Sequence, residues 1–171
     1  KLYLEDKVAS SSPNLAFMEF NDRWTIGIAA SPNNVFNHVS FVNSINTNRG
    51  GTHVNYITSQ VVSSLSTFLK KKYPALEEYI TGPLIRSNLF IFVKSYIENA
   101  SFDSQAKELL TTKPGSFGST CLIPTSFLKD LEKDSDLVKR IVALARAREQ
   151  SSSLASIVQA TSSKSKAKVL M

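Results

Sequence analysis

Apolar and polar positions alternate in the first part of the chain, as they do in half-buried strands. Residues 24–29 place Trp24 and two isoleucines on one face at a period of two. A similar run at residues 15–20 precedes them across a short polar turn, and residues 38–42 form a third apolar run. Because short links join the three runs, we predict three antiparallel strands in a meander.

A long helix is predicted directly after Gly50 and Gly51. Apolar residues recur there at spacings of three and four, which is the period of an amphipathic helix. They are Val54, Ile57, Val61, Leu65 and Phe68. Thr52 can cap this helix, and three lysines at residues 70–72 end it. The two glycines suit a tight turn that packs close to backbone or to a phosphate, and the pattern leaves both roles open.

The middle of the chain contains one strongly apolar strand among loops. Residues 89–97 are almost continuously apolar, which predicts a strand in the centre of a sheet. Residues 73–87 are interpreted as a connector, and residues 99–118 as a loop with a short helical turn at residues 104–110. Residues 120–123 are interpreted as a further edge strand.

Two helices are predicted towards the carboxy-terminal end, separated at residues 134–136. The second carries Leu137, Ile141 and Leu144 on one face, and the serines at residues 151–153 weaken it. Residues 1–14 are interpreted as a strand remnant and a polar loop. Strands and helices together predict an α+β fold, in which helices pack on one face of a mostly antiparallel sheet of four or five strands.

Composition permits several functions and excludes few. The chain has 171 residues, which fits one domain, and a net charge of +6, which allows a nucleic-acid or phosphate partner without requiring one. No apolar run approaches the ~20 residues of a membrane helix, so we expect no membrane partner. With His38, His53 and the single Cys121 as the only soft ligands, we predict no metal site. One cysteine cannot form an internal disulfide, which fits a reducing compartment.

Three segments carry a resemblance to a known family. Residues 38–62, HVSFVNSINTNRGGTHVNYITSQVV, resemble the transducer domain of type IIA DNA topoisomerases. Residues 20–34 and 88–121 resemble the flanking hairpin, strand and ATP-sensing loop of the same domain. The resemblance runs collinearly over about residues 15–148. The motifs are more similar to those of the eukaryotic enzymes than to those of the bacterial gyrase B subunit.

The resemblance implies a fold and a domain organisation. The fold is a ribosomal-protein-like (domain 2-type) βαβ sandwich with a long carboxy-terminal helix. Residues 1–148 would form the transducer domain, and residues 149–171 would form the end of that helix and a Ser/Lys-rich tail.

The resemblance also implies a function. The chain would be one segment of an ATP-dependent isomerase, coupling ATP binding and hydrolysis at an amino-terminal gate to the passage of double-stranded DNA. The catalytic Tyr lies outside this chain, which would be inactive alone. ATP and Mg²⁺ would serve the whole enzyme. Its partners would be double-stranded DNA, the adjacent ATPase and DNA-gate domains, and a second copy in a homodimer. The expected location is the nucleus, with an organellar form as the alternative.

Two sets of site residues follow from the resemblance. Gln105, Ala106 and Lys107 match the family's Gln-Thr-Lys loop, so Lys107 would contact the γ-phosphate of ATP and Gln105 would bond beside it. Ala106 departs from the usual Thr, which puts any contact from that side chain in doubt. From the pattern alone, Lys107 is interpreted as an exposed, solvated side chain.

Lys70, Lys71 and Lys72 match a lysine cluster that faces captured DNA in the family. The pattern alone supports a second role equally well, because lysines at a helix end offset the helix dipole. A different function class also remains: a free-standing basic α+β module that binds nucleic acid. The length of the full reading frame discriminates between the two.

Overall fold

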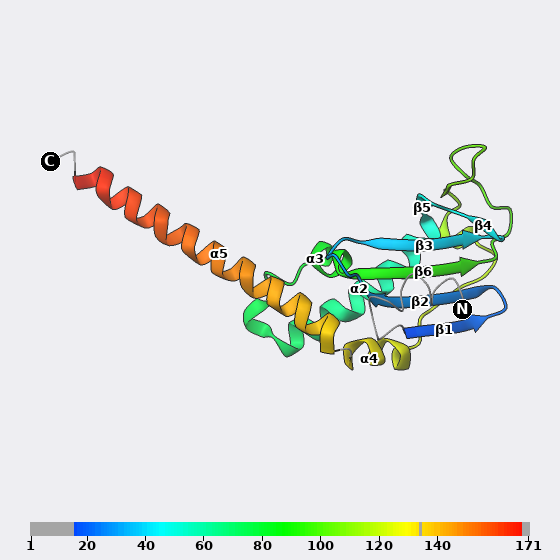
Figure 1. Cartoon of the computed structure of the whole chain (residues 1–171), viewed down its shortest axis with the longest axis horizontal. Coiled ribbons are helices and arrows are strands. Elements are labelled where there is room, and N and C mark those ends of the chain that lie inside the picture. Colours follow the sequence, from blue (N-terminus) through cyan, green and yellow to red (C-terminus); the bar gives the residue numbers. More distant parts are fainter. Residues whose placement is uncertain (1–15, 134, 169–171) are drawn as a thin grey trace.

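The computed structural model describes residues 16–133 and 135–168, which form a five-stranded sheet, helices on one of its faces, and a long helix that extends away from it (Figure 1). The strand order is β1-β2-β6-β3-β4. These strands span Ala16–Asn21 (β1), Trp24–Ala30 (β2), Asn37–Val42 (β3), Ile45–Asn46 (β4) and Leu89–Ser95 (β6). Two short strands, β5 (Gly50–Gly51) and β7 (Leu109–Leu110), pair in parallel as a second sheet.

The helices include one long helix within the domain and one that extends beyond it. The α-helices span Thr52–Lys72 (α2), Gly82–Ser87 (α3), Thr125–Lys133 (α4) and Ser135–Lys168 (α5). Two 3₁₀ turns occupy Pro74–Leu76 (η1) and Pro114–Ser116 (η2). None of these described helices is both long enough and apolar enough to cross a membrane. The α+β class is confirmed.

The strand order corrects the predicted meander. β1 and β2 form the expected antiparallel hairpin, but β3 is not the neighbour of β2. β6 lies between them, antiparallel to β2 and parallel to β3. The most apolar strand takes the centre, where it has a neighbouring strand on each side. The segment from β3 through α2 supplies the long crossover that a parallel pair requires.

The main core lies between the sheet and the helices. β2 contributes Trp24, Ile26 and Ile28 at the predicted period of two, and all three are buried. α2 contributes Ile57, Val61 and Leu65 from its predicted stripe. The positions that point to the other face of the sheet form a smaller apolar cluster. Its members are Ala29, Val39, Phe41, Phe90 and Phe92.

Four local predictions were wrong. Gly51, and not Thr52, is the cap residue of α2, because the Thr52 hydroxyl donates to the carbonyl of Thr112 instead. Residues 104–110 form a turn and then β7 rather than a helical turn, and residues 120–123 form no strand. The connector at residues 73–87 contains the short helix α3. Bonds to distant parts of the chain explain the first three differences. α3 instead begins at a local cap, in which the Thr81 hydroxyl accepts from the amide of Leu84.

The serines do not end the last helix. α5 continues through residues 151–153 to Lys168. The hydroxyls of Ser151 and Ser153 donate to the carbonyls of Ala147 and Glu149, one turn earlier, so they are satisfied within the helix. The predictions made for residues 1–14, and for Asp134 in the break between α4 and α5, lie outside the described residues.

Candidate functional site

The three residues matched to an ATP-sensing loop lie together at the tip of the loop between β6 and β7. Gln105, Ala106 and Lys107 are all exposed. The amide of Lys107 donates to the carbonyl of Ser104 over 3.1 Å, which closes a tight turn. Lys107 has φ of 56°, in the left-handed region that non-glycine residues rarely adopt. The turn therefore holds the lysine in a defined, energetically unfavourable backbone conformation.

Hydrogen bonds close the loop at its base. The amide of Asp103 donates to the carbonyl of Leu109 over 3.2 Å, and the amide of Thr111 donates to the carbonyl of Ser101 over 2.9 Å. The amide of Ser101 donates to the hydroxyl of Thr112 over 2.8 Å. The two sides of the loop are thus bonded to each other, and its tip projects from the body of the domain beside β5 (Figure 1).

The loop is also fixed to the segment that leads into α2. The amide of Arg49 donates to the carbonyl of Glu108 over 3.0 Å, and its guanidinium forms an ion pair with Asp103 at 2.5 Å. Sequence reasoning missed Arg49. Its signal is a cation directly before two glycines, and that pattern alone does not reveal the distant carboxylate.

The two glycines serve close packing. Gly51 has φ of 133°, and a Cβ there would lie 2.4 Å from the carbonyl oxygen of Leu110. Gly50 has φ of 74°, and a Cβ there would lie 3.0 Å from the His38 ring. Only glycine lets β5 approach β7 this closely. Of the two roles that the sequence left open, the structure supports packing against backbone.

A buried polar network lies behind β5. The hydroxyls of Ser40 and Thr47 lie 2.6 Å apart, and Thr47 Oγ1 lies 3.2 Å from His53 Nε2. His53 Nδ1 is buried without a hydrogen-bond partner among the described residues. Burial, and secondarily the charge of His38, lower the pKa of His53 to about 3. Burial, and secondarily Arg86, also lower the pKa of His38. This network supports the turn before α2 and carries no charge at neutral pH.

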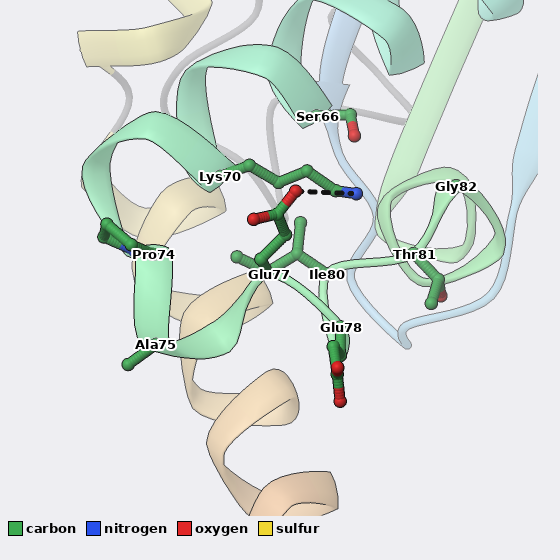
Figure 2. A pocket seen from close by; sticks show the side chains of 9 residues that line it. All are labelled: Ser66, Lys70, Pro74, Ala75, Glu77, Glu78, Ile80, Thr81 and Gly82. Carbon is green, nitrogen blue, oxygen red and sulfur yellow. Dashed lines mark ion pairs between the residues drawn. The ribbon is translucent and has the colours of Figure 1, made fainter.

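Lys70 lies at the carboxy-terminal end of α2, over a cavity of about 640 Å³. Figure 2 shows its side chain passing Glu77, with a Nζ–Oε1 separation of 3.9 Å. Glu78, Ser66 and Thr81 also line the cavity. Both partners of the ion pair are well exposed, so the pair contributes little to stability.

The other two lysines of the cluster point elsewhere. Lys71 borders a separate hollow that it shares with Glu132. Lys72 Nζ lies 5.3 Å from the ring centroid of Phe68 and 5.7 Å from that of Tyr73. The structure therefore brings Lys70, Lys71 and Lys72 to three neighbouring environments rather than to one.

α2 connects the two predicted sites without bringing them together. Its first residues contact the loop, through Gly51 against Leu110 and through the Thr52 hydroxyl bonded to Thr112. Its last three residues are the lysines. A helix of 21 residues is about 30 Å long at 1.5 Å per residue. The roles assigned to both sets of residues stay predictions.

The part of the chain that the structure describes offers no group of three His, Cys, Asp or Glu side chains that could hold a metal ion. Cys121 is buried, and burial raises the pKa of its thiol to about 12.

Comparison with known proteins places these features in a family. The family model described as DNA gyrase B matches residues 2–159. The mitochondrial DNA topoisomerase 2 of Dictyostelium discoideum is 48% identical over 129 residues, covering 75% of this chain and 10% of its own length. The DNA topoisomerase 2 of Saccharomyces cerevisiae is 43% identical over 147 residues, covering 85% of this chain and 10% of its own length. The chain thus spans about a tenth of these relatives.

Two solved structures share the fold. The ATPase and transducer domains of DNA topoisomerase II from Balamuthia mandrillaris match with a TM-score of 0.81 and 36% identity, over 86% of this chain and 37% of that one. The ATPase region of Saccharomyces cerevisiae topoisomerase II matches with a TM-score of 0.74 and 41% identity, over 84% of this chain and 36% of that one.

Proposed function

Because this chain belongs to the DNA gyrase B family, we propose that it is the transducer segment of an ATP-dependent type IIA DNA topoisomerase. The whole enzyme is an isomerase that passes one DNA duplex through another. This segment couples ATP binding and hydrolysis in a neighbouring domain to that passage. We assign residues 1–148 to the transducer domain, and residues 149–171 to the end of its last helix and a tail.

The observation that carries the proposal is the placement of α2. The helix is bonded at Thr52 to the base of the Lys107 loop and ends in the lysine cluster. A rigid helix transmits a displacement at one end to the other, and the chain then continues through the helices that lead into α5. A change at the nucleotide thereby reaches the DNA side of the domain.

The residues at the tip of the loop fit a nucleotide phosphate. The ammonium of Lys107 has three donors and a full charge, which suit phosphate oxygens. Gln105 can donate an amide N–H beside it, whereas Ala106 has no polar side-chain atom. The contact exists only while the γ-phosphate is present, so its loss reports hydrolysis. Mg²⁺, when bound in the neighbouring domain, would neutralise phosphate charge there.

The partners of the whole enzyme follow from the same assignment. They are double-stranded DNA, the adjacent ATPase and DNA-gate domains of the same polypeptide, and a second copy in a homodimer. Lys70, Lys71 and Lys72 supply the DNA contacts of this segment. The relatives are eukaryotic proteins, one of them mitochondrial, which supports the nucleus as the location and an organelle as the alternative. The free-standing nucleic-acid-binding module is not favoured, since the relatives are about ten times longer.

Substitution of Lys107 in the full-length enzyme tests the proposal. Removing a phosphate clamp typically lowers turnover by ~10²–10³-fold, so we expect Lys107→Ala to lower steady-state ATPase by about that factor. Stability should hardly change, because the side chain is exposed. Ala106→Thr is the matched control within the same turn and should change turnover much less. Near-normal ATPase in Lys107→Ala would refute the assigned role, and a large fall in melting temperature would show that the lysine holds the loop together.

A further inference from the structure

The segment at residues 121–123 leads into α4 without joining either sheet. Its two outer residues are buried, whereas Leu122 between them is 67% exposed, an alternation typical of a strand. No strand of the described chain pairs with this segment. α4 begins at Thr125, two residues later, so whatever holds the segment also fixes the start of that helix.

A side chain of α2 takes the place of the missing strand. Gln60 Nε2 donates to the carbonyl of Cys121 over 3.0 Å, and Gln60 Oε1 accepts from the amide of Ile123 over 3.0 Å. One residue of a parallel strand makes the same two bonds to its neighbour, one on each side of the residue that it faces. We call this pair of bonds the Gln60 clasp.

The hydrogen bonds of Gln60 fix the orientation of its amide. The second N–H of Nε2 donates to the carbonyl of Tyr56 over 3.1 Å, within α2. The nitrogen, which has two donors, therefore faces two carbonyls, while the oxygen faces an N–H. The reversed amide would place an oxygen against two carbonyls and a donor against a donor. The side chain is half-buried, so water competes less with these bonds than it does at the surface.

Two further residues on the same face of α2 contact the returning chain. Thr52 donates to the carbonyl of Thr112 over 2.6 Å, and the Tyr56 hydroxyl accepts from the amide of Cys121 over 3.4 Å. Residues four positions apart lie on one face of a helix, so Thr52, Tyr56 and Gln60 form one stripe. The stripe is about 12 Å long at 1.5 Å per residue. α2 is thus bonded first to the base of the loop and then, two turns later, to the chain that enters α4.

We propose that Gln60 is a positioning residue, which makes the start of α4 follow the movements of α2. The inference rests on the proposed function and gives its signal a more direct route to α5. A displacement of α2 by the loop reaches the clasp after two turns, well before the end of the helix, and α4 packs against both α2 and α5. The clasp can pass on this displacement because both of its bonds end on backbone atoms, which cannot rotate away as side chains do.

Strand passage per ATP hydrolysed in the full-length enzyme tests the proposal. Gln60→Leu keeps a similar volume and removes both bonds of the clasp. We expect strand passage per ATP to fall at least about fivefold, the lower end of typical coupling between two sites. Basal ATPase should change little, since Thr52 still holds the base of the loop. Ser59→Ala is the matched control, because it removes a bond made within α2 and should leave the ratio unchanged.

Gln60→Glu distinguishes the clasp from simple support of the helix. An ionised carboxylate cannot donate to the carbonyls of Cys121 and Tyr56, so strand passage per ATP should be low at alkaline pH. The protonated form regains one donor and keeps an acceptor for Ile123, and the two carbonyls favour this form. Relative to the wild type at the same pH, the ratio should therefore rise between about pH 8 and about pH 5.5.

The Gln60 and Lys107 variants test the two proposals separately. An unchanged ratio in Gln60→Leu, including equal losses of both activities, would overturn the role of Gln60. A ratio in Gln60→Glu that does not depend on pH would overturn it as well. If Lys107→Ala lowers ATPase while the Gln60 variants stay coupled, the proposed function stands and this route is wrong. A wild-type enzyme without ATP-dependent strand passage would overturn both.

Discussion

The role proposed for Lys107 requires one exposed residue to be held in a defined position for a ligand that a neighbouring domain binds. Its backbone lies in the left-handed region, and its side chain is exposed. A non-glycine residue in that region costs ~1–2 kcal/mol, so the surrounding bonds must stabilise the turn. Arg49 supplies two of those interactions, through its amide and through its ion pair with Asp103.

We predict that Arg49 positions the loop. In the full-length enzyme, Arg49→Ala should lower ATPase by about tenfold, because a loop displaced by ~1 Å loses geometry that the reaction needs. Its melting temperature should stay close to that of the wild type, since the Arg49 side chain is 58% exposed and solvent screens its charge. The charge swap Arg49→Asp with Asp103→Arg should recover part of the lost turnover. No recovery in the swap would mean that the guanidinium acts other than through Asp103.

His53 should make stability depend on pH. Its pKa is lowered to about 3 in the folded chain, from 6.5 when unfolded, so the unfolded chain binds a proton first as the pH falls. Stability is therefore fully present above pH 6.5 and declines between about 6.5 and 3. Between pH 7.5 and 5.5 the free energy of unfolding should fall by about 1 kcal/mol.

Urea denaturation of the 171-residue chain at several pH values checks this dependence. His53→Gln should flatten the curve over this interval, even if it lowers stability at pH 7.5. His38→Gln should flatten it less, because burial displaces that pKa less far. Equal slopes in the wild type and His53→Gln would contradict the assignment.

Among the elements, α2 connects the base of the Lys107 loop to the lysines at residues 70–72. Its stripe of apolar residues is buried in the main core, which fixes its orientation against the sheet. Its amino-terminal end depends on Gly51, where any side chain would meet the Leu110 backbone. Its carboxy-terminal end presents the three lysines about 30 Å away.

Changing all three lysines should separate two activities of the full-length enzyme. In Lys70→Ala with Lys71→Ala and Lys72→Ala, we expect stimulation of ATP turnover by DNA to fall several-fold. Basal turnover should change little, because the cluster lies at the far end of α2 from the loop. ATPase assays with and without duplex DNA measure both. Equal losses in the two assays would show that the lysines stabilise the helix end instead.

At the scale of the whole molecule, the loop that carries Lys107 projects from one end of the domain, and the long helix α5 extends in another direction (Figure 1). α5 extends from its first turn, where Val138 is buried, to Lys168. This arrangement fits the proposed role, in which the segment transmits a movement between two other parts of a larger protein.

The 171-residue chain should not bind ATP by itself. One exposed ammonium attracts a phosphate in water by only ~1 kcal/mol, which is far from the roughly 8 kcal/mol of micromolar binding. We expect calorimetry to detect no affinity tighter than about 1 mM. Inorganic triphosphate serves as the matched control for simple charge attraction. Clear micromolar binding of ATP to this chain would contradict the transducer assignment.

The sequence by itself determined which segments are helices and strands where hydrophobic periodicity was strong. The period of two around Ile26 and the periods of three and four in α2 produce buried faces, and the apolar run at residues 89–97 becomes the central strand. These patterns suffice because burial of apolar surface is the dominant favourable term in folding. The sequence motif at residues 38–62 was also enough to identify the family.

Only the tertiary structure decided what depends on partners distant in sequence. The predicted meander was wrong because β6 lies beside β2. The short link between β2 and β3 had indicated that β3 would be the neighbour of β2. Thr52 does not cap its helix because Thr112, sixty residues later, accepts its hydroxyl. The contact of Arg49 with Asp103 likewise requires the folded chain. The local pattern of apolar and polar residues predicts which face of a helix or strand is buried. Which residue of another element packs against that face is decided only when the separate elements come together.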